Sequence, residues 1–263
     1  MAITSTFTKK VTMTHIGTAT AILEIDGMTF LTDPFFSPAG SSWPLPHGGE
    51  LKVSDDPALK LNQLPHIDAV LLSHENHPDN LDELGRQLLD GRRVFTTPDG
   101  ANNLAPRPSV IGLKDWEETM VTIGGKTFEI TATPCVHVPG HECVGFIIHT
   151  EDFGATNGQK NAIYFSGDTI YVEDLAKMTD KFHIAVAIMN LGKAMMPGLQ
   201  ITMDGEQAAR LFHDIKADVL VPMHYDSWGH FTQNEKELSE EFRKEGILDN
   251  IRWLKPGSPV CIN

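Results

Sequence analysis

Residues 73–80 read SHENHPDN and directly follow the apolar run AVLL at residues 69–72. The apolar run is typical of a buried strand, and the polar residues after it place two histidines and an aspartate on a turn. His74, His77 and Asp79 all carry side chains that bind divalent metal ions. The segment is therefore either a polar turn or a metal-binding loop. A metal-binding loop is favoured if residues that can bind a metal also follow other strands.

The same arrangement recurs at three other places in the chain. His137 follows FEITATPCV, Asp168 follows AIYFSG, and His224 follows VLVPM, so each comes directly after a predicted strand. Any one of these residues alone is more often structural than functional. If the sheets bring these strand ends to one edge, imidazoles and carboxylates converge in a set that suits zinc or a similar divalent ion. We therefore predict a metal site.

The segments around these residues indicate a mixed α/β architecture. Two hairpins are expected, at Asp26–Gly27 and Gly124–Gly125, because these dipeptides favour the left-handed conformations of tight turns. Further strands are predicted in residues 67–74, 143–150, 161–168, 182–190 and 217–225, and helices in residues 80–91, 203–217 and 235–246. We expect one domain over residues 1–263, with two sheets packed face to face and helices outside. Long loops at about 36–62 and 98–118 are expected to shape the site.

Composition limits the classes of partner. The formal net charge of −14 argues against binding to nucleic acid or anionic membranes, and no uninterrupted apolar segment predicts a membrane span. Three cysteines, Cys135, Cys143 and Cys261, show no pairing pattern, so we predict small buried thiols and a reducing, cytoplasmic location. The expected partner is a small-molecule substrate. The chain is expected to be either a monomer or a homo-oligomer.

The chain resembles the metallo-beta-lactamase superfamily, and within it the branch of ascorbate-phosphate lactonase-like hydrolases. The resemblance rests on five motifs in the same order: HIGTATAILEIDGMTFLTDP, LLSHENHPDNLDE, TPCVH, YFSGDT and VPMHY. It implies an α/β fold, the alpha-beta-beta-alpha sandwich, with the metal site at the sheet edge. It also implies that Asp33 supports the site from beneath, that His137 and His224 are ligands, and that Asp168 bridges two metals.

The first metal loop departs from the superfamily's usual H-x-H-x-D-H. Aligned from the right, His77 is the second histidine, Asp79 is the aspartate, Asn80 replaces the last histidine, and one residue is inserted after His74. Aligned from the left, Pro78 falls on a ligand position, and that register is rejected because proline has no side-chain donor. An asparagine oxygen is a weaker ligand than imidazole. The second metal site is therefore expected to be weak, differently built or absent.

This ligand set predicts a metal-dependent hydrolase. A divalent ion, Zn²⁺ with Mn²⁺ and Fe²⁺ as alternatives, lowers the pKa of bound water and supplies hydroxide, and Asp79 is the expected catalytic residue that orients it. His15, in THIGTAT, is expected to lie on a strand, and the glycine-rich turn that follows it is a candidate to approach the metal loop. The expected substrate-binding residues are Phe35, Phe36, Trp43, Lys193, Met195, Met196 and His230.

Aromatic and thioether walls suit a small, largely apolar electrophile. Within the branch, the loop SHENHPDNLDELG and the opening HIGTATAILEIDG look most like isothiocyanate hydrolases, which convert R–N=C=S to an amine and carbonyl sulfide in detoxification. The alternatives are a lactonase or lactamase that opens a cyclic ester or amide, and a non-catalytic metal-binding sensor.

Overall fold

The computed structural model describes residues 7–44 and 49–263, and it contains two large β-sheets. The first sheet has the strand order β18 (Val260–Cys261), β1 (Val11–Gly17), β2 (Thr20–Ile25), β3 (Met28–Thr32), β6 (Ala69–Leu71), β7 (Arg93–Thr96), β8 (Val110–Gly112). The second has the order β17 (Val219–Met223), β14 (Phe182–Asn190), β13 (Gln159–Phe165), β11 (Val144–His149), β10 (Lys126–Pro134), β9 (Glu118–Ile123), and β12 (Ala155–Thr156) pairs with β13.

Both predicted hairpins are confirmed. Strands β2 and β3 pair with Ile25 opposite Met28, and both turn residues, Asp26 and Gly27, have positive φ, at 52° and 83°. These are the conformations that a two-residue turn between twisted strands requires. Strands β9 and β10 are joined in the same way by the turn at residues 124–125.

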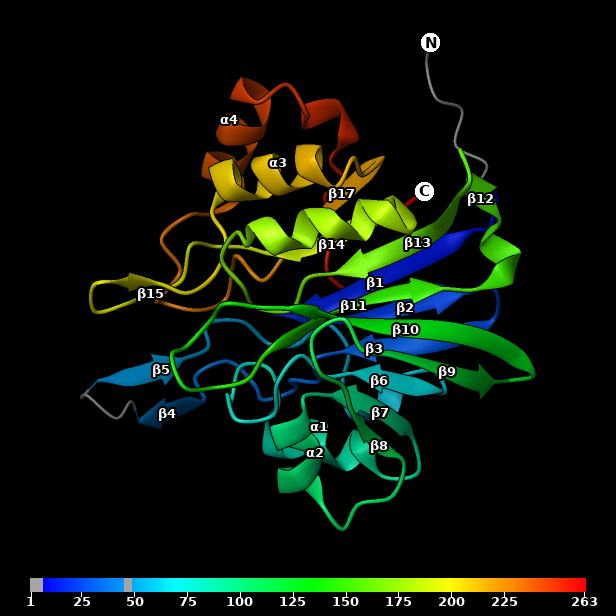
Figure 1. Cartoon of the computed structure of the whole chain (residues 1–263). Helices are drawn as coiled ribbons and strands as arrows, with labels where there is room; N and C mark the ends of the chain where they lie inside the picture. Colours follow the sequence, from blue (N-terminus) through cyan, green and yellow to red (C-terminus); the bar gives the residue numbers. More distant parts are fainter. Residues whose placement is uncertain (1–6, 45–48) are drawn as a thin grey trace.

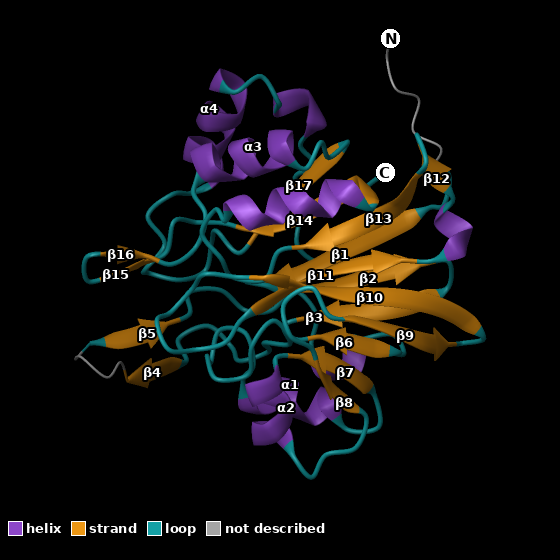
Figure 2. Ribbon diagram, viewed as in Figure 1, coloured by secondary structure: helices purple, strands orange, loops and turns teal. Residues whose placement is uncertain are grey.

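The sheets lie face to face, and helices cover their outer faces (Figures 1 and 2). The central core is formed by apolar side chains from both sheets, among them Phe30, Phe128 and Phe146. A second cluster lies between the β14 sheet and the helices η4 (Glu173–Asp180), α3 (Gly205–Asp214) and α4 (Glu235–Lys244). A third lies between the β3 sheet and α1 (Glu83–Arg86), η2 (Gln87–Leu89) and α2 (Pro98–Leu104). The predicted alpha-beta-beta-alpha sandwich is therefore confirmed.

The two predicted long loops contain more structure than the sequence suggested. The first holds the hairpin β4 (Ser42–Pro44) and β5 (Glu50–Lys52) and the short helix η1 (Leu61–Gln63). The second holds α2 and β8, because the Thr97 side chain accepts a 2.9 Å hydrogen bond from the Gly100 amide and Pro98 occupies the first helical position. The remaining short elements are η3 (Glu151–Phe153), β15 (Met195–Met196), β16 (Leu199–Gln200) and η5 (Leu248–Asn250).

The predicted helix at residues 80–91 is shorter than expected. It consists of the single α-helical turn α1 followed by the 3₁₀ turn η2. The Asp82 carboxylate caps α1 by accepting from the Gly85 amide at 2.6 Å, and it also accepts from the Phe36 amide at 3.0 Å. This carboxylate thus joins the start of α1 to the segment that follows β3.

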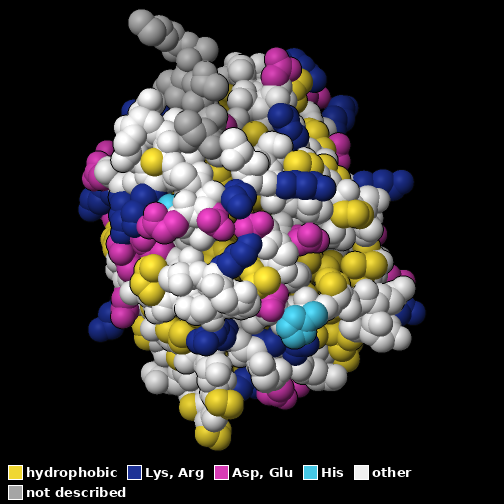
Figure 3. All heavy atoms as spheres, turned by 90° about the vertical axis from the view of Figure 1, so that its right-hand side faces the viewer, with side chains coloured by type: hydrophobic (Ala, Val, Ile, Leu, Met, Phe, Trp, Pro, Cys, Tyr) yellow, Lys and Arg dark blue, Asp and Glu magenta, His cyan; other side chains and the backbone are white. Residues whose placement is uncertain are grey.

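Charged side chains of both signs are interspersed on the face at the right-hand side of Figure 1 (Figure 3). That face therefore shows no continuous basic field of the kind that nucleic acid binding uses. None of the helices in residues 7–44 and 49–263 has the length and apolar character needed to cross a bilayer.

We predict that Gly85→Ala destabilises the fold. Ordinarily this change in a helix is favourable by about 1 kcal/mol. Here a Cβ at residue 85 would overlap the backbone carbonyl of Pro34, and overpacking typically costs about 1–3 kcal/mol, so the overlap should dominate. Urea unfolding should show a lower free energy for Gly85→Ala. The matched control is Gly229→Ala, whose Cβ would meet no atom within 4 Å; equal stability of the two variants would contradict the prediction.

Candidate metal centre

The strands deliver the candidate residues to one edge of the sandwich because their carboxyl ends point the same way. Strands β3, β6 and β7 are parallel to one another, as are β13, β14 and β17. Strand β10 runs antiparallel to β11, which runs antiparallel to β13, so β10 has the direction of β13. The loops after these strands gather at the left-hand edge in Figure 1, where the hairpins β4–β5 and β15–β16 also project.

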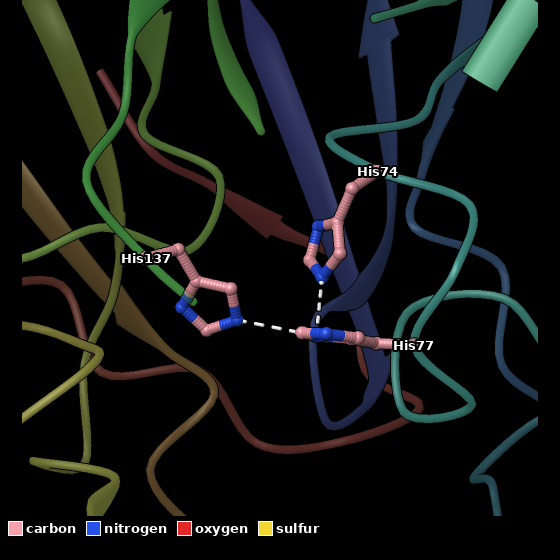
Figure 4. Close-up of side chains that lie close together, drawn as sticks. All are labelled: His74, His77 and His137. Atoms are coloured by element: carbon pink, nitrogen blue, oxygen red, sulfur yellow. Dashed lines mark hydrogen bonds between the residues drawn. The ribbon is translucent and has the colours of Figure 1, made fainter. Parts of the chain in front are cut away.

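Six of the predicted residues come together there in two groups of three. The potential ligand atoms of His74, His77 and His137 lie within 4.8 Å of one another, and the same holds for Asp79, Asp168 and His224. In the first group, His77 Nδ1 is 2.9 Å from His74 Nε2 and 3.2 Å from His137 Nε2, so the three rings converge (Figure 4). Nitrogen ligands of a tetrahedral zinc ion lie about 3.3 Å apart, given Zn–N bonds of about 2.0–2.1 Å. The donor set therefore fits a metal ion.

Asp168 belongs to the second group and is also close to a histidine of the first. Its Oδ2 is 3.5 Å from His224 Nε2 and 3.9 Å from His137 Nε2. Asp79 Oδ2 is 3.7 Å from the same His224 nitrogen. Asp168 therefore lies within reach of histidines from both groups.

Hydrogen bonds from neighbouring residues orient this set. The buried Asp33 carboxylate accepts from the Ser73 amide at 2.7 Å, from the Ser73 hydroxyl at 2.8 Å and from Asn80 Nδ2 at 3.1 Å. Asn190 Nδ2 donates to Asp168 Oδ1 at 2.7 Å, and His137 Nδ1 lies 2.6 Å from the Ile201 carbonyl oxygen. Partners of this kind fix the orientation of metal ligands.

Burial and mutual charge set the protonation of the site. Burial lowers the pKa of His77 to about 4 and that of His74 well below its usual range, with neighbouring histidines adding to the shift of His74. Burial favours a higher pKa for Asp168, but the charge and hydrogen bond of His224 outweigh it and hold that pKa well below its usual range. At neutral pH, His74 and His77 are therefore neutral and Asp168 is ionised, which are the states that bind a metal.

The same buried charges shift the pKa values of His224 and Asp33. Burial lowers the pKa of His224, but the charge and hydrogen bond of Asp168 and the charges of Asp79 and Asp33 together outweigh burial and raise that pKa overall. Burial, followed by the charge of Asp168, raises the pKa of Asp33 to about 8, although the bonds from Ser73 and Asn80 oppose this.

Asn80, which the sequence predicts to replace the last histidine of the usual motif, is fully buried. Its Nδ2 bonds to Asp33, while its Oδ1 has no hydrogen-bond partner among residues 7–44 and 49–263. A buried, unpaired amide oxygen is costly unless another group binds it. The amide oxygen of Asn80 is therefore available as a neutral ligand.

The predicted substrate-binding residues separate into different environments. Phe35 and Trp43 lie together, with ring centroids 5.7 Å apart, and both pack against Trp228. Phe36 points instead into the core between the β3 sheet and its helices.

The other four predicted residues lie on the loops after β14 and β17. Lys193 pairs with Asp204 at 3.2 Å, and Met195 and Met196 form strand β15. The Met195 amide bonds to the His230 carbonyl at 3.4 Å. Burial lowers the pKa of His230, and the charge of Asp79 partly opposes this. The His230 ring lies 4.6 Å from that of Phe231, which in turn lies 4.9 Å from that of His224.

Several residues at the site were missed from the sequence. His141 lies 5.4 Å, ring to ring, from His77, and its Nδ1 is 2.9 Å from Asn76 Nδ2. The spacing of His137 and His141 in HVPGH was the available signal. Phe231, whose ring is 4.9 Å from that of His224, was also missed, because an aromatic residue in a loop carries no such signal.

His15 lies on β1, as predicted, and its Nε2 is 3.0 Å from the Thr18 carbonyl oxygen. Together with His224 it lines a cavity of about 560 Å³. The same cavity is lined by four acidic residues: Asp55, Asp56, Asp226 and Glu235. One wall of the metal centre therefore borders an acidic cavity.

Comparison with known proteins places the chain in a family. A UPF0173 metal-dependent hydrolase of Methanopyrus kandleri is 26% identical over 257 residues, which is 93% of this chain and 97% of the relative. Some curated relatives are longer: the chain matches 59% of the length of an uncharacterized protein of Mycobacterium bovis and 51% of that of a phospholipase D of Saccharomyces cerevisiae.

Two solved structures share the fold. One is an isothiocyanate hydrolase from Delia radicum gut bacteria, with a TM-score of 0.76 and 22% identity over 95% of this chain and 98% of that chain. The other is a metallo hydrolase from Ignicoccus hospitalis, with a TM-score of 0.71 and 22% identity over 95% of this chain and 97% of that chain. A model of the beta-lactamase superfamily domain matches residues 28–225. The chain therefore belongs to the beta-lactamase superfamily.

Proposed function

We propose that this protein, a metal-dependent hydrolase, acts on isothiocyanates and converts R–N=C=S and water to an amine and carbonyl sulfide. The observation that carries the proposal is the aromatic cluster of Phe35, Trp43, Trp228 and Phe231, which contacts the metal residues directly through Phe231 and His224. Its partly exposed members, Trp43 and Phe231, would offer a surface to an apolar tail beside the reacting centre. The reaction would serve detoxification.

The metal would be held by His74, His77 and His137 in one group and by Asp79, Asp168 and His224 in the other, with Asn80 Oδ1 as an additional oxygen donor. When bound, a divalent ion such as Zn²⁺, Mn²⁺ or Fe²⁺ lowers the pKa of a water ligand and polarises the electrophile. The mixed nitrogen and oxygen donors suit all three ions.

Asp79 is the proposed catalytic base. Its carboxylate is buried beside His224 and is positioned to orient the attacking water and accept its proton. The water oxygen forms a bond to the central carbon of N=C=S, and one proton reaches the substrate nitrogen. Cleavage of the C–N bond then releases carbonyl sulfide, and the second proton of the water completes the amine.

His230 is proposed to relay the proton that Asp79 takes from the water: its neutral imidazole accepts a proton at one ring nitrogen and donates one from the other to the substrate nitrogen. Its Nδ1 is buried without a hydrogen-bond partner in the described part of the chain. Its ring lies 4.6 Å from that of Phe231 and 6.2 Å from that of Trp228, so it borders the aromatic cluster as well as the charged residues. A substrate whose tail rests on the cluster would therefore present its nitrogen near this imidazole.

The acidic cavity next to His224 favours this substrate over a lactone. Hydrolysis of an isothiocyanate gives an amine, which is a cation at neutral pH, whereas a lactone gives a carboxylate. Asp55, Asp56, Asp226 and Glu235 attract the first product and repel the second.

We predict that metal-loaded protein consumes benzyl or phenethyl isothiocyanate. Loss of the ultraviolet absorbance of N=C=S should accompany release of amine, a chelator should abolish both, and added metal should restore them. A panel of lactones and lactams provides the comparison. Turnover of that panel by metal-loaded protein that leaves the isothiocyanates intact would refute the proposed substrate.

We predict that Asn80→His strengthens binding of a second metal ion, because imidazole is a better ligand than an amide oxygen for these metals. His74→Ala should instead weaken binding at the histidine group. Metal analysis and titration measure both effects. Asn76→His is the matched control, since it adds an imidazole to the same loop at an exposed position. If Asn80→His and Asn76→His have the same stoichiometry and affinity as the native protein, Asn80 does not limit the second site.

We predict that His230→Gln lowers kcat for isothiocyanates by about 10²–10⁴-fold, the usual range for loss of a general acid or base. Metal content should stay unchanged, because His230 belongs to neither group of candidate ligands. His66→Gln is the control, since the His66 side chain is 82% exposed. Native kcat in the His230 variant would remove this residue from the proposed reaction.

A further inference from the structure

Cys135 and Cys143 occupy opposing positions at the end of one antiparallel strand pair. The last paired residues of β10 and β11 are Pro134 and Val144, so the two cysteines are the next residues on either side. Opposing side chains in such a pair share a face of the sheet, with Cβ atoms about 4.5–5.5 Å apart. A disulfide needs a Cβ separation of about 3.5–4.5 Å, so a small movement past the last paired residues would suffice.

The hydrogen bonds of the two thiols confirm that they face the same loop. Cys135 Sγ donates to the Ser166 carbonyl at 3.3 Å, and Cys143 Sγ donates to the Asp168 carbonyl at 3.3 Å. Both thiols are free in this structure, and the strand register together with these two carbonyl contacts places them opposite one another just beyond the last paired residues.

We propose that Cys135 and Cys143 form a reversible disulfide when a peroxide oxidises the protein, and that this bond weakens metal binding. The effect of the disulfide on metal binding rests on the proposed metal centre. The bond would close the segment 136–142, which carries His137 and His141. It would also redirect Cys143 Sγ, which lies 3.5 Å from His74 Nδ1, away from that histidine and from the Asp168 carbonyl.

The oxidation balances with hydrogen peroxide as the oxidant. Cys135 is half-buried and Cys143 is only 7% exposed, so Cys135 reacts first. Its sulfur takes one peroxide oxygen and becomes a sulfenic acid, and the other oxygen leaves as water. The Cys143 sulfur then forms the S–S bond and displaces the sulfenic oxygen as a second water. The two thiols lose two electrons and two protons, and a dithiol reductant reverses the change.

The cysteine environments differ from the prediction of three buried thiols. Cys143 is buried, Cys135 is half-buried, and Cys261 is exposed near Asn263. Cys261 lies on β18, in the other sheet from β10 and β11, so it provides a control.

The first test uses metal-free protein treated with hydrogen peroxide, denatured in an alkylating agent and digested for mass spectrometry. The expected product is a peptide pair linked through Cys135 and Cys143 that separates on reduction. Cys261→Ser should keep the linked pair, and Cys135→Ser should lack it. Oxidation of Cys135 to the sulfinic acid with Cys143 still alkylated, and no linked pair, would overturn the proposal.

The second test compares metal affinity in the oxidised and reduced protein. We expect about a tenfold or greater loss on oxidation, because residues that orient metal ligands typically contribute about 10–100-fold to affinity. The loss should be reversed by reduction and be absent in Cys135→Ser. Unchanged affinity in protein that carries the linked pair would refute control of the metal centre. Failure of the reduced protein to bind metal would instead count against the proposed function, since the linked pair forms without metal.

Discussion

The buried carboxylate of Asp33 is the constraint on which the metal loop depends. Asp33 follows β3, and its amide donates to the Leu71 carbonyl at 3.0 Å, which joins the ends of β3 and β6. Its two carboxylate oxygens then accept the amide and hydroxyl of Ser73 and the side chain of Asn80. A buried carboxylate is tolerated only with such partners. The loop from residue 73 to residue 80 is thus anchored at both ends, and its histidines and Asp79 can project from a fixed base.

This anchoring shows how Asn80 could take the place of the histidine that the predicted register assigns to this position. A neutral imidazole offers one N–H donor and one lone pair, on opposite sides of the ring. Asn80 offers the same two functions with its Nδ2 and Oδ1, and it uses the first on Asp33 while the second stays unpaired. The substitution therefore preserves the support of the loop. The atom left for a metal is then an amide oxygen on a shorter side chain, which is less basic than an imidazole nitrogen.

The sequence predicted the two hairpins, the sheets and the convergence of six polar side chains, because strand periodicity and strand direction determine all three. It missed α2, since the proline-rich stretch after Thr97 was interpreted as loop. It also treated Phe35 and Phe36 alike. Consecutive residues in an extended segment face opposite sides, so Phe35 joins the aromatic cluster and Phe36 joins the core. Contacts between distant loops, such as Phe231 with His224, depend on loop paths that no local pattern encodes.

The buried charges of the candidate metal centre link the stability of the fold to the binding of a metal ion. Asp33 is fully buried near the ionised Asp168, and its pKa of about 8 lies above the ordinary value of 3.8. Between these two values the folded, metal-free chain binds more protons at Asp33 than the unfolded chain does. Its contribution to the free energy of unfolding therefore falls as the pH rises through this window. A divalent cation beside Asp168 would oppose that carboxylate's charge, lower the pKa of Asp33 and remove part of the penalty. Metal binding and ionisation of Asp33 would thus favour each other.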